Sequence, residues 1–491
     1  MFFAGIDIGT TGSKITIFDN GFAIDKLYIS YPATRTENQH EIDAKNIINA
    51  IKTLIIEADK KYILSAIGIT SFGESFVLLD KDDHIIRPIM LYTDPRGKKE
   101  AKELENLIGR DKLGYITGQI GQGMYTLPKL MYIKKHYTQE YDQIDKVLLI
   151  EDFIVYMLTG IRQIDFSLAC RTLAFDVHTL SWSLEILSKV GIDSNLFSKP
   201  VAVGTKASTI KSSLKEEWKL RSDIEIISIS HDQISNAIGG NVFEEGSAID
   251  GAGTCECLTT IFKGIPSKNI LYEKGYGVIP YLRPGYNVCY SLINSGGSLI
   301  SWVIDNFFMD IKESKENVFK HLDKNVLYDK ISPVLILPHF AGAGTPYMDE
   351  SSKGMIVNLD LSINRYDIYL AALQSIAYEM KLSLTPLQEI GIKIDKIYAS
   401  GGGASNDNWL QMKADILNIP FYQLENSDAG TVGSGIIVGT ALKVFPSLDA
   451  AIEKMIKVKK AFYPRPNYHL KHMDNYKKYC KLYSSMKEIT K

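Results

Sequence analysis

A short turn rich in glycine and hydroxyl side chains, close to the start of the chain, constrains the fold most strongly. Apolar residues alternate before it, at Ile6 and Ile8, and resume after it at Ile15, so the pattern predicts strand, tight turn, strand over residues 4–19. Glycines let an anion approach the backbone, while hydroxyl and ammonium groups donate hydrogen bonds to it. The turn therefore predicts a phosphate-binding hairpin, made by Gly9, Thr10, Thr11, Gly12, Ser13 and Lys14. An ordinary glycine-rich hairpin without a ligand is the alternative.

Two commoner phosphate motifs do not fit this turn. The Walker pattern needs a lysine directly after its last glycine, but Ser13 follows Gly12 and a strand-like run follows Lys14. The dinucleotide fingerprint has another glycine spacing and opens a helix. An actin-type phosphate hairpin is left. Asp7, at the end of the first strand, would repel a phosphate, so we expect it to hold Mg²⁺ through water.

The length and the net charge of the chain limit the classes of protein to which it can belong. A chain of 491 residues predicts two large domains. The formal net charge of −2 shows no polybasic footprint, so we expect a small-molecule substrate and neither nucleic acid nor membrane as partner. Five irregularly spaced cysteines and the lack of a signal segment predict a cytoplasmic protein with reduced thiols. Cys255 and Cys257 have no second pair at zinc spacing, so we read them as strand residues.

Polar residues follow the predicted buried strand at residues 63–70. In open α/β sheets ligands bind at such strand ends. Glu74 lies in the short polar stretch after this strand, and Asp94 and Arg96 come later, after Met90 and Leu91. The two carboxylates are suited to accepting hydrogen bonds from hydroxyl groups, with Arg96 orienting them. A solvated salt bridge in a loop is the alternative.

A second strand end carries the candidate catalytic group. The strongly apolar run 224–229 is followed by Ser-His-Asp-Gln and then by a glycine-rich helix. Phosphorylating a hydroxyl needs a group that accepts its proton, and a positioned carboxylate at Asp232 suits this role. Capping the following helix is the alternative role for Asp232. His231 is expected to form local hydrogen bonds.

Two later stretches predict nucleotide contacts. Gly253 and Thr254, within residues 247–255, echo Gly9 and Thr10, as expected of a duplicated domain with a second phosphate hairpin. Three glycines, 401–403, join a strand to a helix, where they expose backbone amides and let a flat ring lie against the chain. A tight turn without a ligand is the alternative for the second stretch.

These features, in this order, resemble the FGGY family of carbohydrate kinases. Tyr92 and Tyr132 stand where the family usually has tryptophan, and Asn358 replaces a usual glycine. The segments that carry the resemblance are 7–12, 92–96, 124–136, 165–172, 231–233, 294–302, 354–374 and 401–412.

The resemblance implies an α/β fold of two ribonuclease-H-like (actin-like ATPase) domains facing a central cleft. Residues 1–240 would form the N-terminal domain, with the sugar pocket, the first hairpin and the catalytic aspartate, and 241–491 the C-terminal domain with the adenosine site. It also implies ATP and Mg²⁺ as cofactors and Asp232 as general base. The further contacts it implies are Gln233 beside the sugar, Gly297 beside the nucleotide, and Gly402, Gly403 and Asn406 at the adenosine.

The substrate is less constrained than the chemistry. Gly73-Glu74 matches neither the Arg-Glu of glycerol kinases nor the Met-His of xylulose kinases. His231-Asp232-Gln233 resembles pentulose and hexulose kinases, so we favour a ketopentose such as xylulose, with a ketohexose, gluconate, glycerol or another polyol as alternatives. An actin- or chaperone-like ATPase switch is the alternative of another class, and ATP turnover without any sugar would indicate it. Whether the protein forms a homodimer is left open.

Overall fold

The computed structural model describes residues 1–266, 270–314, 317–426 and 428–490. It forms two compact units. The first unit comprises Met1–Gly239, Gly277–Asn287 and Asp428–Ile456, and the second comprises Gly240–Tyr276, Val288–Ser427 and Lys457–Lys491. Two segments from late in the chain therefore belong to the first unit. The functional assignment of 1–240 to the sugar and 241–491 to the nucleotide stays a prediction.

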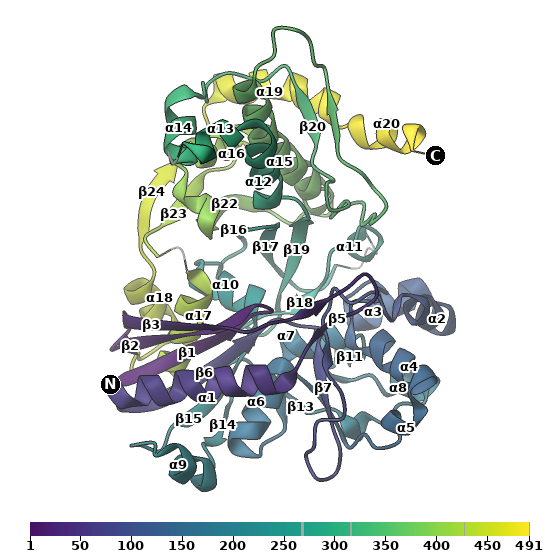
Figure 1. Ribbon diagram of the computed structural model, residues 1–491, viewed down its shortest axis with the longest axis vertical. Coiled ribbons are helices and arrows are strands. Elements are labelled where there is room, and N and C mark those ends of the chain that lie inside the picture. The colour runs from purple at the N-terminus through teal and green to yellow at the C-terminus, as the bar shows by residue number, and fades with distance from the viewer. Residues whose placement is uncertain (267–269, 315–316, 427, 491) are drawn as a thin grey trace. The chain divides into compact units, whose positions relative to one another are not determined.

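A mixed sheet forms the centre of the first unit (Figure 1), in the order β14-β15-β6-β1-β2-β3. Strands β1 (Phe2–Ile8) and β2 (Gly12–Asp19) pair antiparallel, with Ile8 opposite Ser13, which confirms the predicted strand–turn–strand start. The other members are β3 (Phe22–Ser30), β6 (Leu64–Ser71), β14 (Lys206–Thr209) and β15 (Glu225–His231). Their apolar side chains pack on α1 (Ala44–Lys61), whose N-cap is Asp43.

The register of this sheet brings three chain segments to one edge. β1 and β6 run parallel with Ile8 opposite Ser71, and β6 and β15 run parallel with Ser71 opposite His231. Parallel strands end at the same edge of a sheet, so Asp7 and the residues after β6 and β15 lie at that edge. The helix α10 (Asp232–Gly239) starts there.

The segment 428–456 joins the first unit through a contact between two helices. α17 (Ala429–Ala441) packs on α10 at glycine positions, and α18 (Leu448–Met455) packs on α17. A Cβ on Gly239 would lie 1.8 Å from the Ala429 carbonyl oxygen, and one on Gly433 would lie 1.9 Å from that of Ser235. Only glycine allows the two backbones to approach so closely.

The rest of the first unit consists of short strands, helices and 3₁₀ turns (η). They are β4 (Thr34–Arg35), β5 (His40–Ile42), β7 (Phe76–Leu79), β8 (Ile89–Met90), α2 (Lys98–Ile108), α3 (Arg110–Thr117), α4 (Thr126–His136), α5 (Thr138–Tyr141), β9 (Lys146–Leu149), α6 (Ile150–Thr159), β10 (Gln163–Asp165), α7 (Phe166–Ala169), η1 (Cys170–Thr172), β11 (Phe175–Asp176), β12 (Ser181–Trp182), α8 (Leu184–Val190), η2 (Ser194–Leu196), β13 (Lys199–Val201), α9 (Ser212–Trp218) and β18 (Ile279–Pro280).

The second unit repeats the arrangement of the first. β16 (Gly246–Ala252) and β17 (Glu256–Lys263) form an antiparallel hairpin, and β22 (Ile394–Ser400) runs parallel to β16. The sheet continues through β23 (Phe421–Leu424) and β24 (Val458–Phe462) on one side and β19 (Tyr286–Ile293) on the other. The echo of residues 4–13 in residues 247–255 thus corresponds to a structural repeat.

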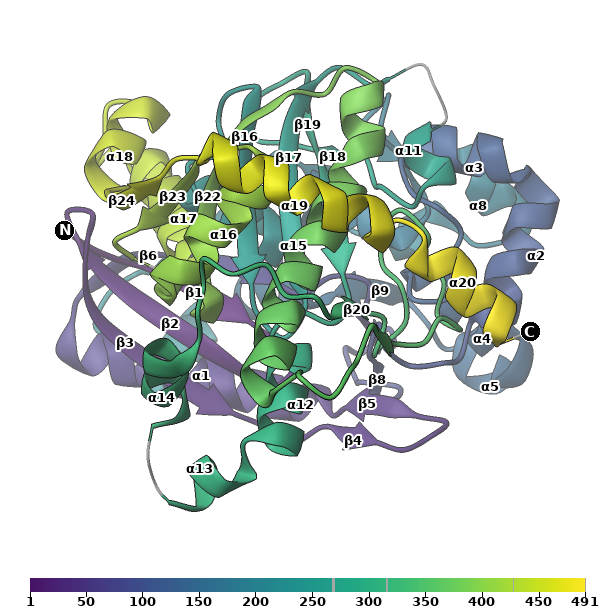
Figure 2. The ribbon, with the colours of Figure 1, turned by 90° about the horizontal axis from the view of Figure 1, so that it is seen from above.

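Helices cover the sheet of the second unit. α12 (Gly297–Phe307) and α16 (Asp407–Leu417) pack against the long α15 (Arg365–Glu389), and the three lie side by side (Figures 1 and 2). Residues 365–374 of the segment 354–374, which carries part of the family resemblance, lie in α15. The remaining elements are α11 (Ile270–Glu273), α13 (Met309–Glu313), α14 (Val318–Asn325), β20 (Leu335–Leu337), β21 (Met355–Val357), η3 (Gly402–Ser405), α19 (Pro466–Tyr479) and α20 (Leu482–Ile489).

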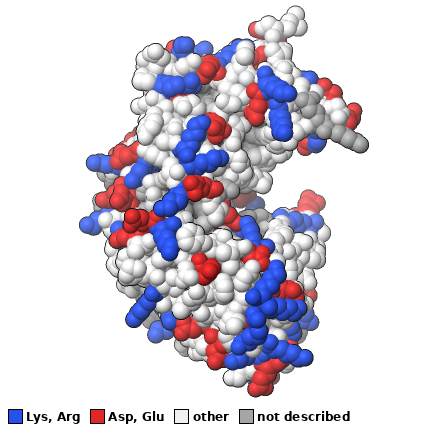
Figure 3. Space-filling model, turned by 90° about the vertical axis from the view of Figure 1, so that its left-hand side faces the viewer, with Lys and Arg blue, Asp and Glu red and all other residues white. Residues whose placement is uncertain are grey.

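The surface shows no single dominant sign of charge on the face drawn in Figure 3, where basic and acidic side chains are interspersed. Within the described residues, we find no helix that combines the length and the apolar character needed to cross a bilayer.

The contact between α10 and α17 can be tested by substitution. Gly433→Ala forces a methyl group into the backbone of α10, so we expect the free energy of unfolding to fall by at least about 3 kcal/mol, the upper end for overpacking. Chemical denaturation followed by tryptophan fluorescence measures this. Gly402→Ala is the matched control, because a Cβ there meets no atom within 4 Å. Equal stability of the two variants would contradict the close helix contact.

Candidate active site

In the first hairpin the two threonines, Thr10 and Thr11, are accessible to solvent, whereas Ser13 is buried. The amide of Gly9 donates to the Gly12 carbonyl at 2.9 Å, which closes the turn. Ser13 Oγ is buried 3.2 Å from the Tyr31 hydroxyl, so this serine supports the turn from behind. Thr11 is exposed and Thr10 half-buried, and their hydroxyls remain the accessible donors.

An ammonium group between two carboxylates lies beside this hairpin. Lys14 Nζ is 3.1 Å from Asp7 Oδ2 and 2.8 Å from Asp428 Oδ1, and Lys26 also bonds to Asp428. Burial lowers the pKa of Lys14, but Asp7 and Asp428 outweigh it, so its pKa is raised and the side chain stays charged. Asp428 directly precedes α17, and nothing in the sequence pairs it with residue 14.

Asp232 stands where β15 ends and α10 begins. Its side chain is 33% exposed, while Oδ1 is buried and accepts no hydrogen bond from the described residues. Burial, followed by the charges of Asp7 and Glu74, raises the pKa of Asp232 to about 7, with hydrogen bonds from Gln233 opposing the shift. A carboxylate that titrates near neutral pH is suited to accepting and releasing a proton.

His231, beside this carboxylate, is a neutral imidazole. Burial, and then the charge of Arg171, lowers the pKa of His231 well below its usual value. Its Nε2 lies 3.2 Å from Asp232 Oδ1, and its backbone amide donates to Ser167 Oγ at 2.9 Å. These local contacts agree with the role expected of His231.

Glu74 is held by an arginine that the sequence did not single out. Glu74 is buried with φ of 65°, and Arg171 Nε lies 2.5 Å from its Oε1. A Cβ on Gly73 would lie 3.0 Å from Arg171 Cγ and 3.1 Å from His231 Cδ2. Gly73 therefore gives Arg171 the room to reach Glu74. Arg171 lies in the segment 165–172 that resembles the family. This resemblance was the only feature of the sequence that pointed to a role for Arg171.

Asp94 and Arg96 form a buried ion pair instead of a solvated one. Asp94 accepts hydrogen bonds from the Arg96 amide, Nε and Nη2 at 3.0, 2.8 and 2.6 Å, and from the His40 amide at 2.8 Å. Burial alone would raise the pKa of Asp94, but these bonds lower it. They occupy the acceptor positions of the carboxylate. A role of Asp94 in binding hydroxyl groups stays a prediction.

A large cavity in the second unit collects every nucleotide contact predicted for that part of the chain. Its volume is about 1080 Å³, in the range of ligand pockets. Aromatic side chains of Trp302, Phe319, Tyr369 and Trp409 line it. The predicted residues in its wall are Gly253, Thr254, Gly297, Gly402, Gly403 and Asn406.

The glycines of this cavity differ in their surroundings. A Cβ on Gly402 meets no atom within 4 Å, so the position faces open space. A Cβ on Gly403 would lie 2.6 Å from the Trp409 ring and 2.7 Å from Ala252 Cβ, so Gly403 is needed for packing. Asn406 accepts from the Trp409 amide at 3.0 Å and is the N-cap of α16.

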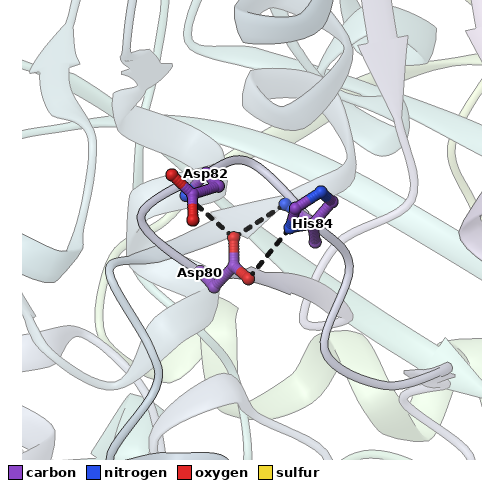
Figure 4. A group of neighbouring side chains, drawn as sticks. All are labelled: Asp80, Asp82 and His84. Atoms are coloured by element: carbon purple, nitrogen blue, oxygen red, sulfur yellow. Dashed lines mark hydrogen bonds and ion pairs between the residues drawn. The ribbon is translucent and has the colours of Figure 1, made fainter.

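Asp80, Asp82 and His84 bring three possible metal ligands together on one loop of the first unit (Figure 4). Asp80 Oδ1 accepts from the backbone amides of Asp82 at 2.9 Å and His84 at 2.8 Å, and Oδ2 lies 3.2 Å from His84 Nδ1. An aspartate that bonds to amides two and four residues on shapes a turn. These contacts account for the cluster without an ion.

Comparison with known proteins places the chain in a family. The model of the FGGY family of carbohydrate kinases, N-terminal domain, matches residues 2–239, and that of the C-terminal domain matches residues 252–442. The chain therefore belongs to the FGGY family of carbohydrate kinases, and its fold is the predicted pair of actin-like ATPase domains. It is an ATP-dependent kinase of the kind that transfers a phosphoryl group to an alcohol.

Individual relatives extend over nearly the whole chain. A xylulose kinase of Staphylococcus epidermidis is 25% identical, over 99% of this chain and 97% of that protein. A glycerol kinase of Pediococcus pentosaceus is 27% identical, over 94% and 92%. Among solved structures, a ligand-bound xylulose kinase from Lactobacillus acidophilus shares the fold with a TM-score of 0.90 at 22% identity, covering 99% of this chain and 98% of that one.

Gly402 provides a test of the cavity. Gly402→Val places a branched side chain in the space that we assign to adenosine, so we expect the Kd for ADP to rise by at least about tenfold, which is about 1.4 kcal/mol. Isothermal titration calorimetry measures it, with circular dichroism to confirm folding. Leu361→Val, at a fully exposed side chain outside the residues lining the cavity, serves as control. Unchanged ADP affinity in folded Gly402→Val would place the nucleotide elsewhere.

Proposed function

We propose that this protein transfers the γ-phosphoryl group of ATP to a hydroxyl of a ketopentose, xylulose first among them, with Asp232 as general base. The observation that carries the proposal is the place of Asp232, at the strand edge shared with Asp7 and Glu74, with a pKa of about 7. The near-complete alignment with a protein named xylulose kinase supports the substrate.

The charges around the proposed sugar site favour a neutral substrate. The guanidinium of Arg171 is paired with Glu74, and that of Arg96 with Asp94 and Glu41. A sugar acid such as gluconate would bring a further carboxylate to cations that are already neutralised, and desolvating it would cost free energy. A neutral ketose can instead exchange hydrogen bonds with these groups through its hydroxyls.

The transition state of phosphoryl transfer is loose, so catalysis depends on alignment and charge stabilisation. In our proposal Asp232 accepts the proton of the attacking hydroxyl, and the backbone amides and hydroxyls of Thr10 and Thr11 donate to the phosphates. The Lys14 ammonium, kept charged by Asp7 and Asp428, adds positive charge beside the hairpin. The cavity of the second unit holds the adenosine.

The residues of the first unit fit a magnesium ion at Asp7. Asp7 and Glu74 both raise the pKa of Asp232, so three carboxylates accumulate at this strand edge, with the cations of Lys14 and Arg171 beside two of them. A hard cation with oxygen ligands would relieve that accumulation. We propose that Asp7 holds Mg²⁺ through water, and that the ion when bound neutralises phosphate charge.

All five cysteines are free, which supports the proposed cytoplasmic location. A homodimer stays open.

A panel of acceptors tests the substrate. We expect ADP release with xylulose at a kcat/KM at least about tenfold above that with fructose, gluconate, glycerol or xylitol, a preference of about 1.4 kcal/mol in transition-state binding. A coupled ADP assay with each acceptor measures it. Preference for another acceptor would contradict xylulose as the substrate, but it would leave the kinase activity itself unchallenged. ATP turnover that is independent of every acceptor would instead indicate an ATPase switch.

The base is tested by its pH dependence and by substitution. Asp232 must be deprotonated to act, so kcat/KM for the sugar, at saturating ATP, should fall as pH drops below about 7. Asp232→Asn should lower kcat by about 10²–10⁴-fold while the protein stays folded, because Asn caps helices as well as Asp. Asp223→Asn, an exposed surface change, is the control. An Asp232→Asn variant with more than about a tenth of wild-type kcat would remove Asp232 from the mechanism.

A further inference from the structure

Three charged side chains lie completely buried in the second unit. Lys413 of α16 places Nζ 2.7 Å from Asp250 Oδ2 on β16, and 3.1 and 3.0 Å from the two carboxylate oxygens of Glu256 on β17. All three side chains have an exposed fraction of 0%. We call Lys413, Asp250 and Glu256 the Lys413 cluster. It involves none of the groups to which the kinase reaction was assigned above.

Such a cluster is costly unless its charges are matched. Burial lowers the pKa of Lys413, but Asp250 and Glu256 outweigh it, so the pKa is raised and the ammonium is retained. Burial raises the pKa of Glu256, with Lys413 opposing the shift. The Lys413 ammonium also lies 3.9 Å from the centre of the Trp409 ring. Removing one partner from a buried pair leaves an uncompensated charge and is strongly destabilising.

The cluster sits at the base of the second hairpin. Asp250 precedes the turn on β16, and Glu256 follows it on β17, with Ala252 opposite Glu256 in the ladder. Lys413 therefore ties together the two strands whose turn carries Gly253 and Thr254. Without the ammonium, the hydrogen bonds that join Asp250 and Glu256 to one donor would be lost, and the two strand ends would no longer be held to each other.

The turn held by the cluster also forms part of the cavity wall. The Gly297 amide donates to the Gly253 carbonyl at 2.9 Å, and the Ser298 amide to that of Thr254 at 3.1 Å, so the start of α12 rests on the turn. A Cβ on Gly296 would lie 2.7 Å from Glu256 Cγ, so this segment packs directly on the cluster. Gly253, Thr254 and Gly297 all line the cavity.

We infer that Lys413 is a positioning residue for the nucleotide phosphates, because its ammonium holds the ends of β16 and β17 in the shape that the Gly253–Thr254 turn needs to bind them. This inference rests on the proposed function, in which the cavity takes the adenosine of ATP, and on the predicted second phosphate hairpin at Gly253 and Thr254. The alternative is a core ion pair that stabilises the unit as a whole. The two differ in which part of the nucleotide loses affinity when the ammonium is removed.

Calorimetry with ADP and with adenosine separates the two. We expect Lys413→Met to raise the Kd for ADP by at least about tenfold, while the Kd for adenosine changes by less than about twofold, because only ADP presents phosphates to the turn. Lys477→Met, on an exposed lysine of the same unit, is the matched control and should bind both ligands as the wild type does. Equal ADP affinity in wild type and folded Lys413→Met would overturn the inference, and so would an equal loss for both ligands.

A second variant keeps the test decisive if Lys413→Met does not fold. The double variant Lys413→Met with Glu256→Gln removes one buried carboxylate along with the ammonium, so we expect it to fold better. It still lacks the ammonium that joins the strands, so it should keep the selective loss for ADP. If the double variant bound ADP as tightly as the wild type does, the inference would be wrong. A wild-type protein that binds no ADP would refute the proposed function instead.

Discussion

The parallel pairing of β1, β6 and β15 is the constraint on which the proposed chemistry of the first unit depends. Because Ile8, Ser71 and His231 share one register, carboxylates that are far apart in the chain reach the same strand edge. Their mutual repulsion, added to burial, raises the pKa of Asp232 to about 7. The backbone ladder thus places the proposed base and also tunes its proton affinity, without a dedicated partner residue.

Three buried cations are each compensated by carboxylates close by. Arg171 pairs with Glu74, Arg96 with Asp94, and Lys413 with two carboxylates. Each pair fixes a loop or a hairpin end that carries candidate site residues, since a buried charge without its partner costs several kcal/mol. The pairs therefore hold the geometry of the candidate sites. Because Arg171 and Arg96 are already paired with carboxylates, they support our proposal of an uncharged sugar.

Close helix contacts explain why the chain order and the compact units differ. The glycines of α10 and α17 allow two backbones to touch, which docks residues 428–456 in the first unit and puts Asp428 beside Lys14. The small residues of α17 permit tight packing, but they do not indicate which helix is the partner. The apolar pattern of a helix predicts which of its faces is buried. Which element packs against that face depends on the whole fold.

The sequence by itself determined the two hairpins, the strand that leads to Asp232, the glycine junction at 401–403 and the family, because these are local patterns of apolar period and turn residues. All six residues of the second unit that the sequence predicted as nucleotide contacts are among those lining the cavity. Only the tertiary structure decided the roles of Arg171, Asp428 and Lys413. Their partners lie 97, 414 and more than 150 residues away, and no local pattern encodes which distant charges burial will bring together.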